Sequence, residues 1–252
     1  MKALMVKWKE QNRRLMEEAR ILGWKGLVKA AWKDFFANRS WGQWLYLILL
    51  SSAPLVLEAT NPSSSHDWLG LFASWTGIVC VILVAEGRAG NYFFGLINSA
   101  IYLVLAFQAG FYGEMLTTLY FLVMQPIGLY NWLVNRVKGP EQVTSFESKK
   151  LDLKGWLKSL GLTALIWLGM GLLYQGIGSQ RPFRDSITDG TNGVGQILMT
   201  GLYREQWLFW IATNLFSIYL WWGSNIHMQG MYWVYTLNSI VGWYQWTRAL
   251  KK

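Results

Sequence analysis

The chain has 252 residues, of which 53% are hydrophobic and 15% are charged, against about 25% charged in an average soluble domain. It contains 17 Trp, 12 Tyr and 12 Phe, but five Pro and one Cys. This composition excludes a disordered, collagen-like or disulfide-stapled chain and predicts a membrane protein. The net charge of +9 comes from Lys and Arg between apolar runs, a pattern typical of cytoplasmic loops rather than of nucleic-acid binding.

The first 41 residues carry ten Lys and Arg and lack a compact apolar core that ends in small residues. We therefore expect no signal peptide. Apolar residues such as Leu4, Trp8 and Leu15 lie between these charges. The pattern predicts a basic amphipathic helix over residues 1–40 that lies on an anionic membrane surface.

Eight apolar stretches follow, and we predict that each crosses the membrane as a helix. The sixth is weak, since it holds Asp189, Asn192 and Gln196 among glycines, but the charge pattern supports it. With eight spans and both ends of the chain inside, 21 of the 23 Lys and Arg fall on the cytoplasmic side. The predicted spans lie near Trp41–Leu57, Trp68–Ala85, Gly90–Phe107, Met115–Val134, Trp156–Tyr174, Ser186–Leu202, Gln206–Trp222 and Met228–Trp246.

Spans two to four are predicted to repeat as spans six to eight. Asn91–Asn98 aligns with Trp207–Asn214 at an offset of 116 residues, and Gly128–Trp132 aligns with Gly242–Trp246 at an offset of 114. The alternative, that hydrophobic helices resemble one another by composition, stays open. Each unit has three helices, so the fifth span between them restores the chain direction and makes the units parallel, as in some carriers.

The predicted fold class is therefore an all-α membrane protein with two parallel three-helix repeats joined by a linker helix. One extra N-terminal transmembrane helix precedes them, and we infer nothing functional from it. The expected divisions are the amphipathic helix (1–40), the extra helix (41–66), repeat 1 (67–134), the cytoplasmic linker with its linker helix (135–180), and repeat 2 with a basic tail (181–252).

Enzyme signatures are absent from the sequence. It has no GxxxxGK[ST] phosphate-binding loop, no His and Cys at metal-ligand spacing, and no readable nucleophile beside a base. We therefore expect no catalytic residue, no metal and no cofactor. Asp185 and Asp189, at the outer end of the sixth span, are explained by helix capping and by pairing with Arg181 or Arg184, with proton coupling as the alternative.

Four amide side chains lie near the middle of their predicted spans: Asn98, Gln125, Asn214 and Asn238. An amide in hydrocarbon is costly unless its hydrogen bonds are satisfied. Such residues face the interior of a bundle, where they join helices or line a polar cavity. Because each repeat contributes two amides at one depth, a shared cavity at the membrane midplane is favoured.

Two of these amides share a helix face with aromatic side chains. Trp207, Trp210 and Asn214 lie within about 60° of one another around the helix axis, and Phe94 and Asn98 lie on the equivalent face of the repeat. Flat rings beside amides suit a planar, polar ligand, whether neutral or cationic. A belt of aromatic residues at the membrane interface is the alternative, and for Trp207 the two interpretations are equally good. We predict a substrate site made of the four amides together with Trp207, Trp210, Asn91, Phe94, Tyr120 and Tyr235.

The Trp207-x-x-Trp210-x-x-x-Asn214 motif, with Asn98 and the proline kink after Gln125, resembles the PnuC family of nicotinamide riboside transporters. The resemblance covers essentially the whole membrane core. It implies a bacterial inner-membrane uniporter that lets nicotinamide riboside run down its gradient, with a fold similar to that of the SWEET sugar carriers. A cytosolic kinase would then phosphorylate the riboside for NAD synthesis. Trp207, Trp210 and Asn214 match the motif, whereas the other site residues are assigned by depth and symmetry.

The absence of a readable ATP site or ion site agrees with facilitated diffusion by alternating access. A phosphorylated ligand would enter with its charge unpaired, because we expect no cationic side chain in the cavity. Alternatives are carriage of another vitamin or nucleoside, such as thiamine or a deoxynucleoside, or of a sugar, and, in a different class, a non-transporting membrane scaffold. The expected partners are nicotinamide riboside and the lipid bilayer, and the sequence is compatible with a homo-oligomer without requiring one.

Overall fold

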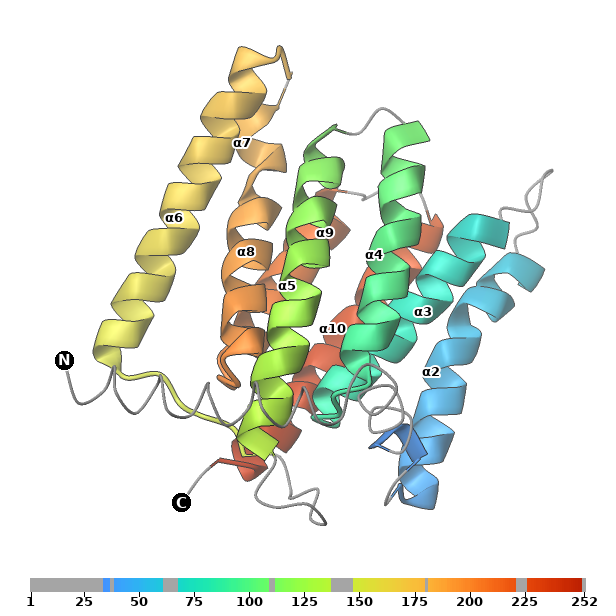
Figure 1. The fold of residues 1–252 in the computed structure, drawn as a ribbon. Helices are drawn as coiled ribbons and strands as arrows, with labels where there is room; N and C mark the ends of the chain where they lie inside the picture. The colour runs from blue at the N-terminus through green and yellow to red at the C-terminus, as the bar shows by residue number, and fades with distance from the viewer. Residues whose placement is uncertain are drawn as a thin grey trace.

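The computed structural model consists mainly of α-helices in its described part, which comprises residues 34–36, 39–60, 68–108, 112–136, 147–179, 181–220 and 226–250 (Figure 1). The predicted amphipathic helix over residues 1–40 lies almost wholly outside this part. Each of the eight predicted spans corresponds to one helix, including the weak sixth, which forms α8. The helices are α2 (Trp41–Thr60), α3 (Trp68–Ala85), α4 (Asn91–Gln108), α5 (Tyr112–Arg136), α6 (Leu153–Gly176), the single turn α7 (Pro182–Asp185), α8 (Ile187–Thr200), α9 (Gln206–Leu220) and α10 (Ile226–Arg248).

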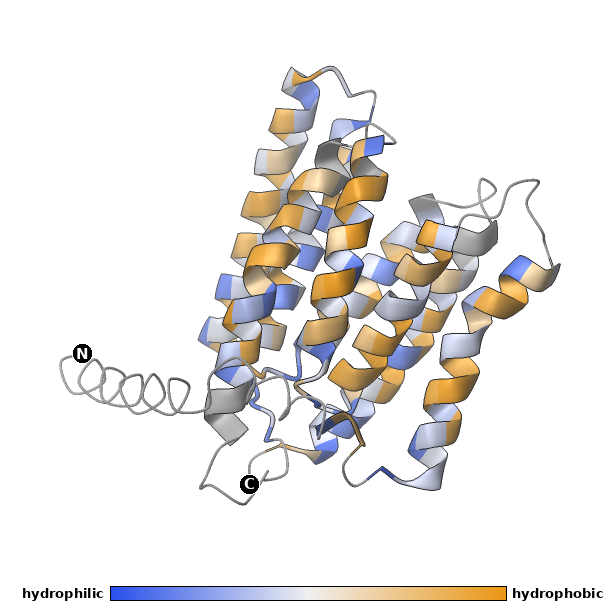
Figure 2. Ribbon diagram, turned by 45° about the vertical axis from the view of Figure 1, so that its right-hand side comes forward, coloured by the Kyte–Doolittle hydropathy of each residue, from blue (hydrophilic) through white to orange (hydrophobic). Residues whose placement is uncertain are grey.

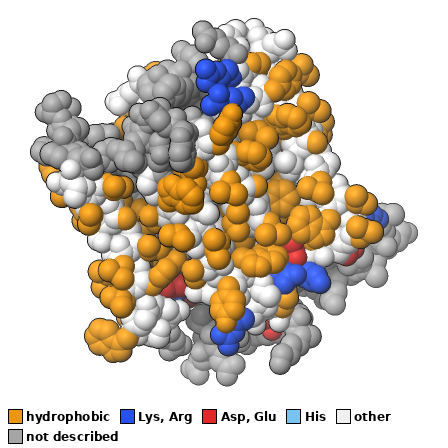
Figure 3. Space-filling view, turned by 180° about the vertical axis from the view of Figure 1, so that it is seen from behind, with side chains coloured by type: hydrophobic (Ala, Val, Ile, Leu, Met, Phe, Trp, Pro, Cys, Tyr) orange, Lys and Arg blue, Asp and Glu red, His pale blue; other side chains and the backbone are white. Residues whose placement is uncertain are grey.

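The outer surface of the bundle is apolar. Among the described helices, α2, α3 and α6 are long and apolar enough to cross a membrane, judged by length and composition, and α4 holds a shorter apolar stretch, Asn91–Leu105. Hydrophobic side chains cover much of the middle of the face in Figure 3, and hydrophobic residues recur along the length of the helices in Figure 2. On α6, Leu157, Leu165 and Leu172 are each more than 60% exposed. Lipid accommodates such a surface and water does not, so the chain is a multi-pass membrane protein.

The helices form two groups of three, which we call the first triplet (α3, α4, α5) and the second triplet (α8, α9, α10). Within each triplet, the middle helix packs against the other two. The triplets meet where α3 packs against α10 and where α5 packs against α8. Outside them, α2 packs against α3 and α10, and α6 packs against α8 and α7. The helix α2 therefore lies beside the first triplet as α6 lies beside the second.

One end of the bundle, here called the basic end, brings together distant parts of the chain: the start of α2, the α3–α4 turn, the start of α6, the α8–α9 turn and the end of α10 (Figure 1). Arg39, just before α2, forms an ion pair with Glu86 in the α3–α4 turn (2.5 Å). Ser148, before α6, pairs with Leu250 at the end of α10. The opposite end of the bundle, beside α7, is called the far end. Described cations at the basic end include Arg39 before α2, Arg88 and Arg204 in the α3–α4 and α8–α9 turns, Lys149, Lys150 and Lys154 before and at the start of α6, and Arg248 in the last turn of α10, whereas the far end has Arg181 and Arg184 beside α7.

The turns at the basic end repeat with an offset of 115 residues. In the α3–α4 turn, the N–H of Gly87 (φ 65°) donates to Val84 O, and in the α8–α9 turn the N–H of Leu202 (φ 63°) donates to Met199 O. A positive φ suits glycine but costs about 1–2 kcal/mol for leucine. The Leu202 side chain is only 2% exposed, so its packing in the core offsets the cost of this backbone conformation.

The same offset governs the first turn of α4 and of α9. The N–H of Tyr92 donates to Ala89 O, and the N–H of Trp207 donates to Arg204 O, in each case three residues earlier. Tyr92 and Trp207 are therefore structurally equivalent. Each ring also packs on a glycine in the third helix of its triplet. A Cβ on Gly128 would lie 2.2 Å from the Tyr92 ring, and one on Gly242 would lie 2.4 Å from the Trp207 ring. The offset of 116 residues read from the sequence is therefore wrong by one.

Four buried aromatic residues close the space between the triplets at the basic end. Trp132 Nε1 donates to Met199 O at the end of α8 (2.9 Å), and Trp246 Nε1 donates to Val84 O at the end of α3 (3.0 Å). Each tryptophan thus ties the third helix of one triplet to the first helix of the other. The two indole rings lie 5.7 Å apart. We call this cluster the aromatic plug, and its members are Tyr92, Trp132, Trp207 and Trp246.

Candidate functional site

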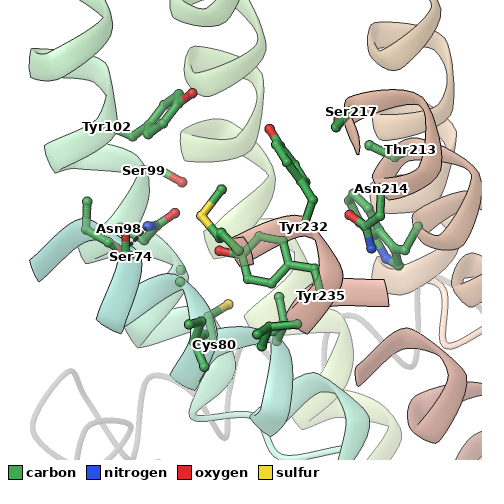
Figure 4. Close-up of a pocket in the computed structure, with 18 of the residues that line it drawn as sticks. Ser74, Cys80, Asn98, Ser99, Tyr102, Thr213, Asn214, Ser217, Tyr232 and Tyr235 are labelled. Carbon is green, nitrogen blue, oxygen red and sulfur yellow. Dashed lines mark hydrogen bonds between the residues drawn. The ribbon is translucent and has the colours of Figure 1, made fainter. Parts of the chain in front are cut away.

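A cavity of about 600 Å³ lies between the two triplets, on the far-end side of the aromatic plug. This volume is within the range of about 300–1,000 Å³ that small-molecule sites occupy. All six triplet helices and α2 contribute to its wall. In Figure 4, α4 presents Asn98, Ser99 and Tyr102 on one side, α9 presents Thr213, Asn214 and Ser217 on the other, and Tyr232 and Tyr235 of α10 lie between them.

Six of the ten predicted site residues line this cavity. The structure brings them together from four helices, α4, α5, α9 and α10. They are Asn98, Gln125, Trp207, Trp210, Asn214 and Tyr235.

The other four predicted residues are not among those that line the cavity: Asn91, Phe94, Tyr120 and Asn238. Asn91 is fully buried and donates to a carbonyl of the α3–α4 turn (2.6 Å). The hydroxyl of Tyr120 donates to Gly193 O and so joins α5 to α8 (2.8 Å), and Phe94 packs edge-on against a tryptophan of α3. In this conformation these side chains hold helices together.

Asn238 joins three helices rather than facing the cavity. Its Nδ2 donates to Val81 O of α3 (2.9 Å), and its Oδ1 accepts from the hydroxyl of Tyr46 in α2 (3.1 Å). The side chain is completely buried, so these bonds satisfy an amide that would otherwise be costly in the membrane interior. Asn238 therefore links α2 to one helix of each triplet, α3 and α10.

Trp210 is positioned by its neighbours on α9 and α8. Its Nε1 donates to Oε1 of Gln206, one turn earlier (3.3 Å). Its ring lies close to Gly195 of α8, where a Cβ would come within 3.3 Å of it, and the ring centroid of Phe121 on α5 is 6.4 Å away. The indole is thus held in place between the two triplets and presents part of its surface to the cavity.

Two glycines make room for polar side chains at the wall of the first triplet. A Cβ on Gly77 would lie 2.6 Å from the Tyr235 hydroxyl and 3.0 Å from Nδ2 of Asn98. That Nδ2 donates to the carbonyl of Ala73 (2.7 Å), which orients the Asn98 amide. A Cβ on Gly95 would likewise lie 2.6 Å from the amide of Gln125. These contacts require the smallest side chain at both positions.

Three buried polar atoms of the lining have no hydrogen-bond partner in the described part of the chain: Gln125 Oε1, Gln196 Nε2 and Trp207 Nε1. An unpaired buried polar group costs about 1–3 kcal/mol. These three side chains therefore have unused hydrogen-bonding capacity beside the cavity, which makes them candidates for contacts with a ligand. The sequence analysis did not include Gln196 in the predicted site. A polar side chain within an otherwise apolar span was the signal that could have identified it.

The cavity carries little charge. Among the described residues that line it, Glu58 is charged and none is Lys or Arg. Asp189 lies nearby in the first turn of α8, where its carboxylate accepts hydrogen bonds from Thr117 of α5 (2.7 Å) and Tyr174 of α6 (2.8 Å). These bonds give Asp189 a role in joining helices. The described residues hold no group of three or more His, Cys, Asp or Glu that suits a metal ion.

A sequence profile of the nicotinamide mononucleotide transporter family matches residues 67–248. The chain belongs to this family. The nicotinamide riboside transporter PnuC of Haemophilus influenzae is 36% identical over 224 residues, which cover 88% of this chain and 94% of that protein. Its counterpart in Neisseria mucosa is 32% identical over 244 residues, covering 91% and 87%. The crystal structure of the vitamin B3 transporter PnuC matches with a TM-score of 0.74 and 30% identity, over 88% of this chain and 97% of that one.

The comparisons confirm the resemblance to the PnuC family, which the Trp207-x-x-Trp210-x-x-x-Asn214 motif suggested. Because the family is one of transporters, the chain is a membrane transporter and not an enzyme. The motif residues all line the cavity. The assignment of individual side chains to the substrate stays a prediction.

Proposed function

We propose that the protein carries nicotinamide riboside across the membrane by facilitated diffusion. The observation that carries this proposal is a cavity that combines indole rings, carboxamides and hydroxyls, with no Lys or Arg among its described lining residues. A pyridinium ring stacks on aromatic faces, while its carboxamide and ribose exchange hydrogen bonds with amides and hydroxyls. The relatives from Haemophilus influenzae and Neisseria mucosa are nicotinamide riboside transporters by name, which supports the same substrate here.

The family name refers to the mononucleotide, which differs from the riboside by a phosphate. A phosphate carries about −1.5 to −2 charges at neutral pH and is bound best by Arg, Lys or clustered N–H donors. The described lining offers no Lys or Arg, and it includes the carboxylate of Glu58. A carboxylate repels a phosphate, so the cavity favours the riboside.

For the transport cycle we propose alternating access between two parallel three-helix repeats, the first and second triplets. The eight long helices would all span the membrane, with both chain ends and the basic end in the cytoplasm, since Lys and Arg are retained on that side. The aromatic plug then acts as the inner gate. To open it, the triplets must separate and break the hydrogen bonds of Trp132 to Met199 and of Trp246 to Val84.

A uniporter brings its substrate to electrochemical equilibrium and cannot accumulate it beyond what the membrane potential supports. Sustained uptake into a cell therefore needs a cytosolic reaction that consumes the riboside. We propose that a riboside kinase supplies this reaction at the inner membrane of a bacterium, because phosphorylation produces an anion that the cavity rejects.

Uptake of labelled nicotinamide riboside into proteoliposomes tests the proposal. In vesicles without a membrane potential, we expect uptake that saturates, stops at equal concentrations, and requires no ion gradient. The mononucleotide should neither enter nor compete, whereas equal transport of both would refute the selectivity argument. Stronger competition by thiamine, a deoxynucleoside or a sugar than by unlabelled riboside would instead identify a different substrate.

Two substitutions in the motif separate a transporter from a scaffold. Trp210→Ala removes a stacking surface, and Asn214→Leu removes an amide whose Nδ2 lies 3.4 Å from the Ser239 hydroxyl. Both variants should weaken riboside binding in titrations of purified protein. If both only lower the melting temperature and leave binding unchanged, these residues merely hold the bundle together.

A further inference from the structure

The internal repeat pairs the residues at the start of the middle helix of each triplet. Because Tyr92 and Trp207 are structurally equivalent, the residues just before them are equivalent too: Asn91 in α4 and Gln206 in α9. Each of these amides is the first residue of its helix, is completely buried, and donates its backbone N–H to the carbonyl three residues earlier. The backbone is therefore the same at the two positions, and differences between them arise from the side chains.

The two amide side chains make different hydrogen bonds. Nδ2 of Asn91 donates to Arg88 O within its own turn (2.6 Å). Gln206 is longer by one methylene, and its Oε1 accepts from the indole Nε1 of Trp210, four residues later on the same side of α9 (3.3 Å). The position equivalent to Trp210 in α4 is Gly95, which has no ring for an amide to hold. The longer amide and the indole thus occur together in the second triplet and are both missing from the first.

The bond to Gln206 fixes the orientation of a ring at the cavity wall. Trp210 lines the cavity, whereas Gln206 is not among the lining residues. Nε2 of Gln206 has no hydrogen-bond partner in the described part of the chain, so the bond to the indole accounts for the orientation of the amide. This bond opposes rotation of the ring about its side-chain bonds. A ring that is already held in place loses less conformational entropy when a ligand stacks on it.

We propose that Gln206 is a positioning residue for substrate binding, which acts through Trp210 and does not contact the ligand. The inference rests on the proposed function, in which Trp210 provides a stacking surface for the pyridinium ring. Without the bond the same stacked contact still forms, but the ring must first be ordered, and this cost lowers the affinity.

A purely structural role for Gln206 makes a different prediction. If its amide served only to hold the start of α9 in the bundle, its loss would lower the melting temperature. Any effect on riboside affinity would then be the same whether or not the side chain at position 210 carries an N–H group. A double-mutant cycle between the two positions therefore distinguishes the roles.

Two variants remove the bond in different ways. Gln206→Met keeps the length of the side chain and removes the amide, whereas Gln206→Asn keeps an amide that is one methylene too short. In calorimetric titrations of purified full-length protein, both should bind nicotinamide riboside about three- to tenfold more weakly, the loss expected when an immobilised side chain becomes free to rotate. The matched control is Gln175→Met, the same change at an exposed position in the last turn of α6, which should keep wild-type affinity.

The variant Trp210→Phe keeps a ring but has no N–H group, so it shows whether Gln206 acts through the indole. In this background Gln206→Met should change the riboside affinity by less than about twofold. The indole N–H resonance of Trp210 can be identified in NMR spectra by its absence from Trp210→Phe. In Gln206→Met this resonance should move upfield and exchange faster with water, because its hydrogen bond is lost.

Wild-type riboside affinity in both Gln206 variants would overturn the inference, as would an equally large loss of affinity in the Trp210→Phe background. If Gln206→Met cannot be purified, Gln206→Asn decides, because the first triplet accommodates asparagine at the equivalent position. A wild type that binds no riboside would refute the proposed function. A wild type that binds riboside with an affinity independent of Gln206 would refute only the positioning role.

Discussion

Substitution of Gly77 by alanine tests whether Tyr235 and Asn98 form one polar contact surface of the cavity. The added Cβ would lie 2.6 Å from the Tyr235 hydroxyl, whereas ordinary contacts begin at 3.4 Å, so the hydroxyl must retreat by 0.8 Å. It would also press on Nδ2 of Asn98 at 3.0 Å and disturb its bond to the α3 backbone. Both groups would then leave the positions from which they reach a ligand.

The expected magnitude follows from two neutral hydrogen bonds. Each contributes about 0.5–1.5 kcal/mol, so the loss of both weakens riboside binding by about 1–3 kcal/mol, or roughly 5- to 150-fold. Overpacking also costs about 1–3 kcal/mol of stability, partly offset by about 1 kcal/mol from the better helix propensity of alanine. The effect on binding should therefore be clear even where the melting temperature changes little.

Gly169→Ala is the matched control for Gly77→Ala. Gly169 is also inside a helix, α6, but a Cβ there would meet nothing within 4 Å. The control should keep wild-type affinity and gain slightly in stability. The measurement is calorimetric titration of each purified variant with riboside, beside a thermal melt. If Gly77→Ala binds within twofold of wild type, then Tyr235 and Asn98 do not contact the ligand as the cavity suggests.

Three further predictions concern the plug, the unpaired donors and the single cysteine. Trp246→Phe keeps a ring in the plug but removes the hydrogen bond to Val84 O, which contributes about 0.5–1.5 kcal/mol. The basic end should therefore open more often. Because Cys80 lines the cavity, its alkylation should become severalfold faster. Gln196→Leu should weaken riboside binding about tenfold yet leave the melting temperature equal or higher, because it removes a buried donor without a partner in the described structure. An unchanged affinity in this variant would exclude Gln196 from the site. In wild type, saturating riboside should slow alkylation of Cys80, and unaltered kinetics would place the ligand elsewhere.

The helices were predictable because membrane spans are selected for length and apolarity, which a sequence displays directly. Even α8, with its polar side chains, was predicted correctly, since the distribution of Lys and Arg required a helix there. Its polarity has a structural reason. Buried residues such as Gln196 and Thr191 face other helices or the cavity, so α8 exposes little of its polar surface to lipid.

The site was only partly predictable because an amide at the membrane midplane has two uses. Asn214 and Asn238 are alike in depth and residue type, yet Asn214 lines the cavity while Asn238 binds the backbone of α3 and the hydroxyl of Tyr46. The choice depends on which way each helix is rotated and on which helix packs behind it. Sequence periodicity gives the relative positions on one helix, but it does not give the neighbour that each face meets.

The helix α2 is a neighbour of the triplets that the sequence analysis did not recognise as part of the site. The alignment began at the second span, so the first span was treated as an addition to the core. In the structure, the segment before α2 binds the α3–α4 turn through Arg39 and Glu86, and the segment before α6 binds the α8–α9 turn through Leu151 N and Glu205 (3.1 Å). The helices α2 and α6 thus each begin beside the basic-end turn of the triplet that follows them in the chain. The helix α2 is the counterpart of α6 in this respect, but it also packs against α10 and contributes Ala53, Pro54, Leu57 and Glu58 to the cavity wall.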